Sequence, residues 1–166
     1  MKKKLRASIV ASLLLAMLCG CDGKGTKTSA PATSTPIEPA MLITPEDAKE
    51  LTGVDFGACT TKEQPGVGLK LCVYEKDGAF LQVGLTQGKT SANTPETLYK
   101  STKDAFKGAE KIEGVGDDNF LAPPGLHILK DGCYITVSTG LQIKDMGQLK
   151  ALGIKAVENL GRHAIK

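Results

Sequence analysis

The chain has 166 residues with 21 basic and 18 acidic side chains, a formal net charge of +3, five cysteines and two histidines. Four of the basic residues lie within the first six positions, so loss of a short leader leaves 17 basic against 18 acidic residues. This near-neutral remainder argues against a nucleic-acid-binding protein, because neutralising phosphates requires a retained excess of lysine and arginine. The length left after such a leader fits one modest folded domain.

The first residues have the organisation of an export signal. Basic residues precede an apolar run over residues 7–18, which is too short to span a bilayer permanently. The run ends in Leu18-Cys19-Gly20-Cys21. This sequence resembles the lipobox of bacterial lipoproteins, in which the signal peptidase cuts before a cysteine that has already been diacylated. The resemblance implies a signal peptide over residues 1–20 and a lipidated Cys21 that attaches the protein to a membrane of the cell envelope.

Two alternatives bear on this anchor. Cys19 is a competing lipidation site, but it would place bulky Leu18 where the lipobox has a small residue. An ordinary secretory signal cleaved near Gly20 would leave Cys21 as a free thiol. Asp22 directly follows Cys21. In a Gram-negative host this aspartate resembles an inner-membrane retention signal, which implies an inner-membrane protein facing the periplasm.

Composition divides the remaining chain into a tether and a domain. Residues 21–40 are rich in Gly, Pro, Ser and Thr and almost lack apolar side chains. They cannot bury enough surface to fold, so we expect a flexible tether. Residues 41–166 are expected to form a single α+β domain, built from antiparallel hairpins and three helices.

The first half of this domain predicts a helix and a hairpin. Residues 44–53 begin with Thr-Pro-Glu-Asp and end in Gly53, which is the pattern of a capped helix. A strand over residues 54–59 and a polar loop over residues 60–68 should follow. Two strands, residues 69–76 and 79–86, then flank Asp-Gly, the dipeptide favoured by a type I′ turn.

The sequence of the second half of the domain also predicts helices and a hairpin. A helix opens at Thr94 and runs to about Lys107, with Leu98, Ala105 and Phe106 as its apolar residues. A second hairpin turns at Asp131-Gly132. A last helix covers about residues 145–160, with one apolar face.

The two hairpins align at an offset of 54 residues. Residues 76–83 match residues 130–137, and the same offset places Leu98 on Leu152 and Phe106 on Leu160. An internal duplication explains this match. Convergence explains it equally well, because any tight hairpin combines Asp-Gly with alternating apolar residues.

Three cysteines belong to the domain, and export would place them where disulfides persist. Cys59 and Cys72 flank one loop, so we expect them to form a disulfide that contributes about 3 kcal/mol by chain entropy. Cys133 could compete for either partner. A thiol left over is expected to be a buried apolar residue, and the absence of Cys-x-x-Cys disfavours a thioredoxin-like redox role.

Neither catalysis nor a cofactor is predicted from the polar residues. A two-residue turn at Asp131-Gly132 places His127 and Cys133 on opposite faces of the sheet, which separates a nucleophile from its base. His163, the other histidine, lies near the C-terminus, and no histidine-based metal site has a recognisable spacing. Asp117-Asp118 is interpreted as part of a turn, since it lacks the ligand rhythm of a calcium loop.

Three short motifs resemble a family of small bacterial envelope lipoproteins that is uncharacterised and abundant in actinobacteria. They are Thr44-Pro45-Glu46, Cys72-Val73-Tyr74, and the Gly-x-Gly-Asp turn at residues 114–120, in which Asn119 replaces the usual small apolar residue. The resemblance implies an α+β fold and no known catalysis. We therefore expect a lipid-anchored binding module for an envelope protein or a small ligand. The alternative is a hydrolase or a thiol or redox enzyme that uses Cys133 or the Asp117-Asp118 loop.

Overall fold

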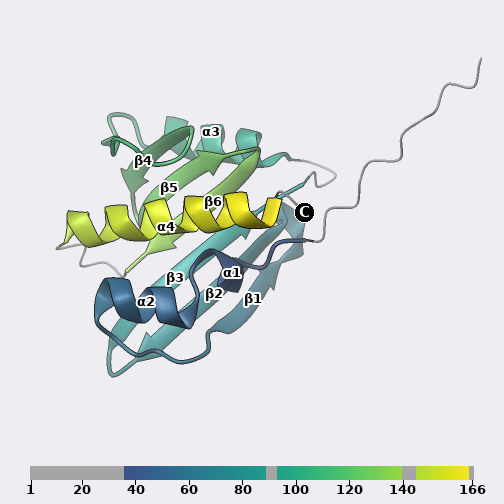
Figure 1. The fold of residues 1–166 in the computed structure, drawn as a ribbon. Coiled ribbons are helices and arrows are strands. Elements are labelled where there is room, and N and C mark those ends of the chain that lie inside the picture. The colour runs from purple at the N-terminus through teal and green to yellow at the C-terminus, as the bar shows by residue number, and fades with distance from the viewer. Residues whose placement is uncertain (1–35, 89–92, 140–144, 165–166) are drawn as a thin grey trace, which may run out of the picture. The chain divides into compact units, whose positions relative to one another are not determined.

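In the described part of the chain, six antiparallel strands form one sheet in the order β1-β2-β3-β6-β5-β4 (Figure 1). The strands are β1 (Thr60–Gln64), β2 (Leu69–Lys76), β3 (Ala79–Thr86), β4 (Asp118–Ala122), β5 (Gly125–Lys130) and β6 (Cys133–Ser138). The computed structural model describes residues 36–88, 93–139 and 145–164. The predicted signal peptide, the predicted lipidation site Cys21 and most of the predicted tether lie outside the described residues.

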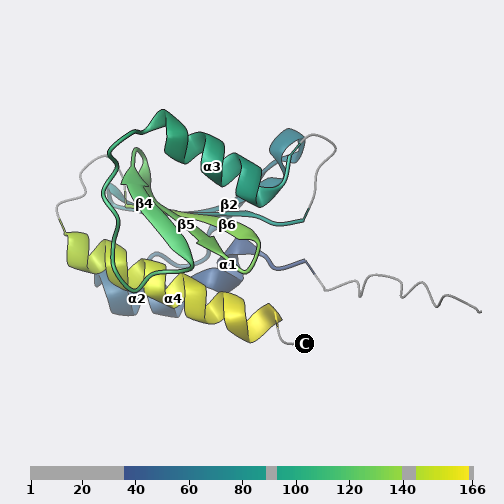
Figure 2. The same ribbon diagram turned by 90° about the horizontal axis from the view of Figure 1, so that it is seen from above.

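Within the described residues, four α-helices cover the sheet from both sides. They are α1 (Pro39–Leu42), α2 (Pro45–Thr52), α3 (Pro95–Ala105) and α4 (Met146–Ala164), and a 3-10 turn, η1 (Pro65–Val67), joins β1 to β2. Helices α1, α2 and α4 lie on one face, whereas α3 lies on the other (Figure 2). The α+β class predicted from the sequence is therefore confirmed. None of the described helices has the length and apolar composition needed to cross a membrane.

Both predicted turns are confirmed, and the strands of the first hairpin have the predicted limits. Asp77 and Gly78 have φ values of 51° and 82°, and Asp131 and Gly132 have φ values of 48° and 70°. A type I′ turn requires positive φ at both central residues, which glycine tolerates freely and aspartate better than most residues do. The local turn chemistry thus fixes the register of β2 with β3 and of β5 with β6.

The predicted strand at residues 54–59 is wrong. That stretch is irregular and contains Gly57 with a φ of 74°, and the strand lies at β1, inside the predicted polar loop. All five residues of β1 are exposed. An edge strand with no buried side chain has no apolar alternation, so hydrophobic periodicity does not reveal it.

The folded part begins before Met41, where the sequence predicted its start. Ile37 is only 9% exposed, and Pro39 and Leu42 are buried. The side chain of Gln87, just after β3, accepts a hydrogen bond from the Ile37 backbone N–H at 3.2 Å and donates to the Ile37 carbonyl at 2.6 Å. Buried Ile37 and Pro39, with the ion pair of Glu38 and Lys70, dock a segment whose composition otherwise looks like a linker.

The correspondence at an offset of 54 residues is seen in the strands but not in the helices. Val83 and Val137, equivalent at this offset, pair with each other at the centre of the sheet. The helices that follow the two hairpins, α3 and α4, lie on opposite faces. Consequently Phe106 is 39% exposed, whereas its expected equivalent Leu160 is 1% exposed.

Helix α3 also buries a different residue from those predicted. Ala105 is exposed and Leu98 is half-buried, whereas Tyr99 is 3% exposed. Tyr99 packs edge-on against Phe120 and Tyr134, with ring centroids 5.2 and 5.6 Å away. This aromatic cluster lies on the face opposite the main core, which α4 covers with Leu149, Leu152, Ala156 and Leu160.

Candidate functional site

The expected disulfide is confirmed. Cys59 and Cys72 are bonded across a separation of 13 residues, with their Cα atoms 5.5 Å apart. Cys72 lies on the core face of β2 and is fully buried. The bond therefore holds the irregular segment before β1 against the second strand, and it leaves Cys133 as a free thiol.

His127 and Cys133 point to opposite faces of the sheet, as the turn register predicts. The His127 ring lies in the aromatic cluster, stacked on Phe120 with centroids 4.5 Å apart, and its Nδ1 is 2.7 Å from the Tyr134 hydroxyl. Cys133 packs against the main core instead. The two side chains are thus not placed to act as a base and a nucleophile.

Burial lowers the pKa of His127, which is 4% exposed. Because the unfolded histidine titrates near pH 6.5, the unfolded chain binds the extra proton first as the pH falls. The stabilisation from the neutral ring is complete above about pH 6.5 and is lost as the pH falls through the lowered pKa of the folded state. The pKa values of Asp117 and Asp118 are lowered from 3.8, so these two carboxylates change the stability only in a separate, more acidic pH range.

We therefore expect the unfolding free energy to decrease as the pH is lowered below about 6.5, and His127→Gln to remove that part of the decrease. Urea unfolding at closely spaced pH values measures it. An identical slope in the variant would contradict the assignment of this effect to His127.

Asp117 and Asp118 are used in two different ion pairs. Asp117 accepts hydrogen bonds from Lys130 at 2.9 Å and from the Asp131 backbone N–H at 3.0 Å. Asp118 pairs with Lys103 and, at 3.4 Å, with Lys111. Although burial alone would raise it, the Lys103 ammonium keeps the pKa of Asp118 low. The two carboxylates do not converge on a shared ligand position.

The neighbouring Asn119 has a structural role that the sequence did not predict. It is 1% exposed, and its amide oxygen accepts from the Ile112 N–H at 2.8 Å. Its amide nitrogen donates to the carbonyls of Ile112 and Val115 at 2.9 and 2.7 Å. Asn119 therefore fixes the segment that runs beside β4, which accounts for a buried polar side chain at this position.

A cavity of about 570 Å³ lies at one end of the sheet. It is lined by Ile37, Lys70, Gln87, Asp131, Cys133 and His163, among others. Burial, with the negative charges of Asp131 and Glu96, raises the pKa of the Cys133 thiol. The thiol is therefore kept protonated, whereas a nucleophilic cysteine needs a lowered pKa.

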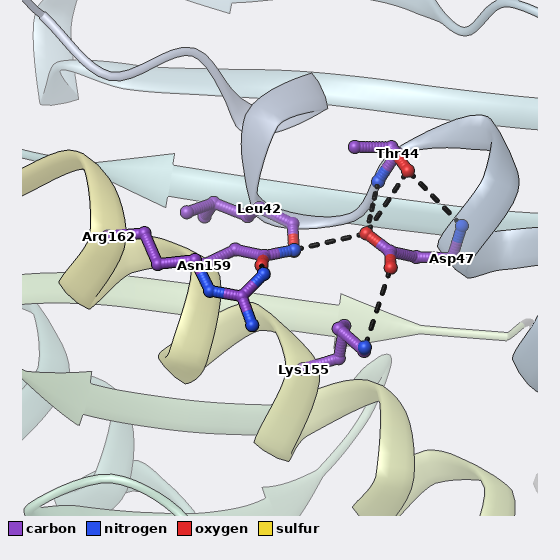
Figure 3. Close-up of polar contacts among 6 residues, drawn as sticks. All are labelled: Leu42, Thr44, Asp47, Lys155, Asn159 and Arg162. Atoms are coloured by element: carbon purple, nitrogen blue, oxygen red, sulfur yellow. Dashed lines mark hydrogen bonds and ion pairs between the residues drawn. The ribbon is translucent and has the colours of Figure 1, made fainter.

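A polar network joins α2 to α4 on the covered face (Figure 3). The Asp47 carboxylate accepts hydrogen bonds from the Thr44 backbone N–H and from Asn159, and its other oxygen lies 3.6 Å from Lys155. Asn159 also donates to the Leu42 carbonyl at 3.1 Å. Although burial alone would raise it, these hydrogen bonds keep the pKa of Asp47 low. The network uses its polar groups internally, so it holds α1 and α2 on the domain.

The two edge strands of the sheet, β4 and β1, differ in whether a described segment lies beside them. Beside β4, residues 109–112 run antiparallel to the strand, and the Leu121 N–H donates to the Glu110 carbonyl at 2.8 Å. Beside β1, no described segment lies along the outer edge, and all five β1 residues are exposed. The chain thus closes one edge itself and leaves the other open within the described residues.

The open edge adjoins a part of the sheet that no described helix covers. On the face opposite α4, helix α3 contacts β5 and β6, and it is the only described helix on that side. The remaining part of this face is formed by β1, β2 and β3, and we call it the open half-sheet. Its apolar side chains, given by the alternation of the strands, are Leu69, Leu71, Val73 and Phe80; all but Val73 are partly exposed.

No protein-family model, curated protein or solved structure matches this chain. Among residues 36–88, 93–139 and 145–164, no three His, Cys, Asp or Glu side chains are grouped to hold a metal ion.

The sequence missed both the cavity and the open half-sheet. Neither has a local signal, because the cavity is lined by five separate segments and the open half-sheet depends on which face α3 covers. The unequal exposure of the two edges could have been suspected from the all-polar Thr60–Gln64 strand.

Proposed function

We propose that this protein is a lipid-anchored binding module of the bacterial cell envelope that holds a protein partner on the open half-sheet and catalyses no reaction. The observation that carries the proposal is that the main core lies on one face of the sheet, whereas on the other face Leu69, Leu71 and Phe80 are partly exposed beside the exposed β1 edge. Exposed apolar surface next to unpaired backbone groups is typical of a protein-binding site.

Anchoring by lipid is supported by the lipobox-like Leu18-Cys19-Gly20-Cys21. Cys21→Ser should abolish fatty-acid labelling and partitioning into detergent, because the acyl chains are attached to this sulfur. Cys19→Ser is the matched control and should leave both unchanged. The reverse outcome for the two variants would overturn the anchor.

Protein binding is tested on the full lipidated chain, extracted from its native envelope in mild detergent. We expect the wild-type protein to migrate as a complex larger than the lipidated monomer. Phe80→Ser, which removes an aromatic ring from the open half-sheet, should shift it to the size of the monomer. Glu158→Gln, at an exposed position of α4, is the control and should migrate like the wild type. Monomer-sized wild-type protein, or an unaffected Phe80 variant, would contradict the proposal.

The cavity beside Cys133 favours a second candidate, the binding of a small ligand. Its volume of about 570 Å³ lies in the usual range for such sites. The raised pKa of Cys133 speaks against a thiol enzyme at this position, and the separate ion pairs of Asp117 and Asp118 speak against a hydrolase at the other.

A further inference from the structure

The β4 edge provides an internal example of how a peptide segment lies along this sheet. Two contacts define the register of that segment: the Leu121 N–H with the Glu110 carbonyl, and the Asn119 side chain with the Ile112 backbone. Both contacts fit an antiparallel segment in one register. The Leu121 N–H therefore points away from β5 and is paired from outside by the Glu110 carbonyl.

The correspondence of the two hairpins at the offset of 54 residues predicts the same backbone geometry for β1. Leu121 pairs with Leu126 of β5, and Thr61 pairs with Cys72 of β2. Cys72 and Leu126 are equivalent at the offset of 54, because they oppose Val83 and Val137 in the two hairpins. Thr61 thus corresponds to Leu121, and its N–H and C=O point outward at an edge where no described segment receives them. Alternating outward donors and acceptors are matched by another extended strand.

The charge of Lys62 determines which kind of strand can pair with β1. Glu63 already lies 3.4 Å from Lys70, whereas Lys62 has no ion pair among the described residues. The register of antiparallel self-pairing with the greatest overlap is centred on Lys62 and places it directly opposite its own copy. Like charges at directly opposed positions are destabilising, and an edge lysine is a common protection against self-association.

We infer that the β1 edge binds an extended segment of a partner protein with an acidic residue opposite Lys62, and does not pair with a second copy of this chain. The inference rests on the proposed function and specifies the partner's chemistry. In the partner segment, the residues on either side of the acidic one would lie on the same face of the sheet as the side chains of Thr61 and Glu63.

The test uses the full lipidated chain in detergent and three synthetic peptides. Each peptide has eight alternating Thr and Val residues, with Glu, Gln or Lys at one central position. Hydrogen exchange is followed at the Thr61 and Glu63 amides. We expect the Glu peptide to slow exchange at both amides and to bind about fivefold more tightly than the Lys peptide, the effect of reversing one cross-strand charge pair.

Two variants make the test specific. Lys62→Glu should reverse the order of the Glu and Lys peptides. Thr61→Pro removes an outward N–H without removing a bond to β2, so it should abolish protection while thermal unfolding stays near that of the wild type. Equal binding of the Glu and Lys peptides, or β1 amides protected by dimerisation without peptide, would overturn the inference. If no peptide protects β1 while Phe80→Ser still dissociates the envelope complex, the inference fails and the proposed function stands.

Discussion

Cys59→Ser is expected to lower the unfolding free energy by about 2–5 kcal/mol, because the loop between Cys59 and Cys72 is no longer closed in the unfolded chain. Reductant should destabilise the wild-type protein by a similar amount. Urea unfolding with and without reductant measures both effects.

The double variant Cys59→Ser with Cys72→Ala provides the control. It should be insensitive to reductant, since no disulfide remains to be broken, and Cys133→Ala should keep the full reductant sensitivity of the wild type. A double variant that still loses stability in reductant would show that Cys133 takes part in a disulfide.

Asn119→Ala is expected to destabilise the domain by about 2–4 kcal/mol, because it leaves the Ile112 N–H and the carbonyls of Ile112 and Val115 without their partner. The amide of Leu121 should also exchange faster, since the segment that covers it is released. Asn119→Asp can still accept from the Ile112 N–H but cannot donate to the two carbonyls, so it should not restore the loss.

Thermal unfolding and hydrogen exchange together check this prediction. Thr102→Ala, which removes a hydroxyl that donates to the Leu98 carbonyl within α3, serves as a control for the Leu121 amide. Stability close to wild type in Asn119→Ala would mean that water or another side chain replaces the three hydrogen bonds.

The features that the sequence predicted are those with a local physical cause. Asp77-Gly78 and Asp131-Gly132 set two turns, and Thr44 with Pro45 and Gly53 sets the limits of α2, through a capping box and a left-handed C-cap. The disulfide followed from the short loop that its cysteines enclose. Each of these depends on residues close in the sequence, so no knowledge of the tertiary packing is needed.

The features that the sequence missed depend on packing between distant segments. Tyr99 of α3 is buried because Phe120 and Tyr134 lie on the face that α3 covers. β1 carries no buried side chain, and Ile37 is docked by Gln87, fifty residues later. The open half-sheet follows from the opposite placement of α3 and α4, which the offset of 54 predicted to be equivalent.

The hydrogen bonds between Gln87 and Ile37 also determine how the domain carries mechanical load. Tension applied to the chain from its N-terminal side reaches Ile37 first, and from there it passes to the end of β3. β3 is an inner strand, bonded to β2 on one side and β6 on the other. Because the next residue, Glu38, pairs with Lys70 of β2, we expect two inner strands to share the load, and the open β1 edge not to be the first strand peeled away.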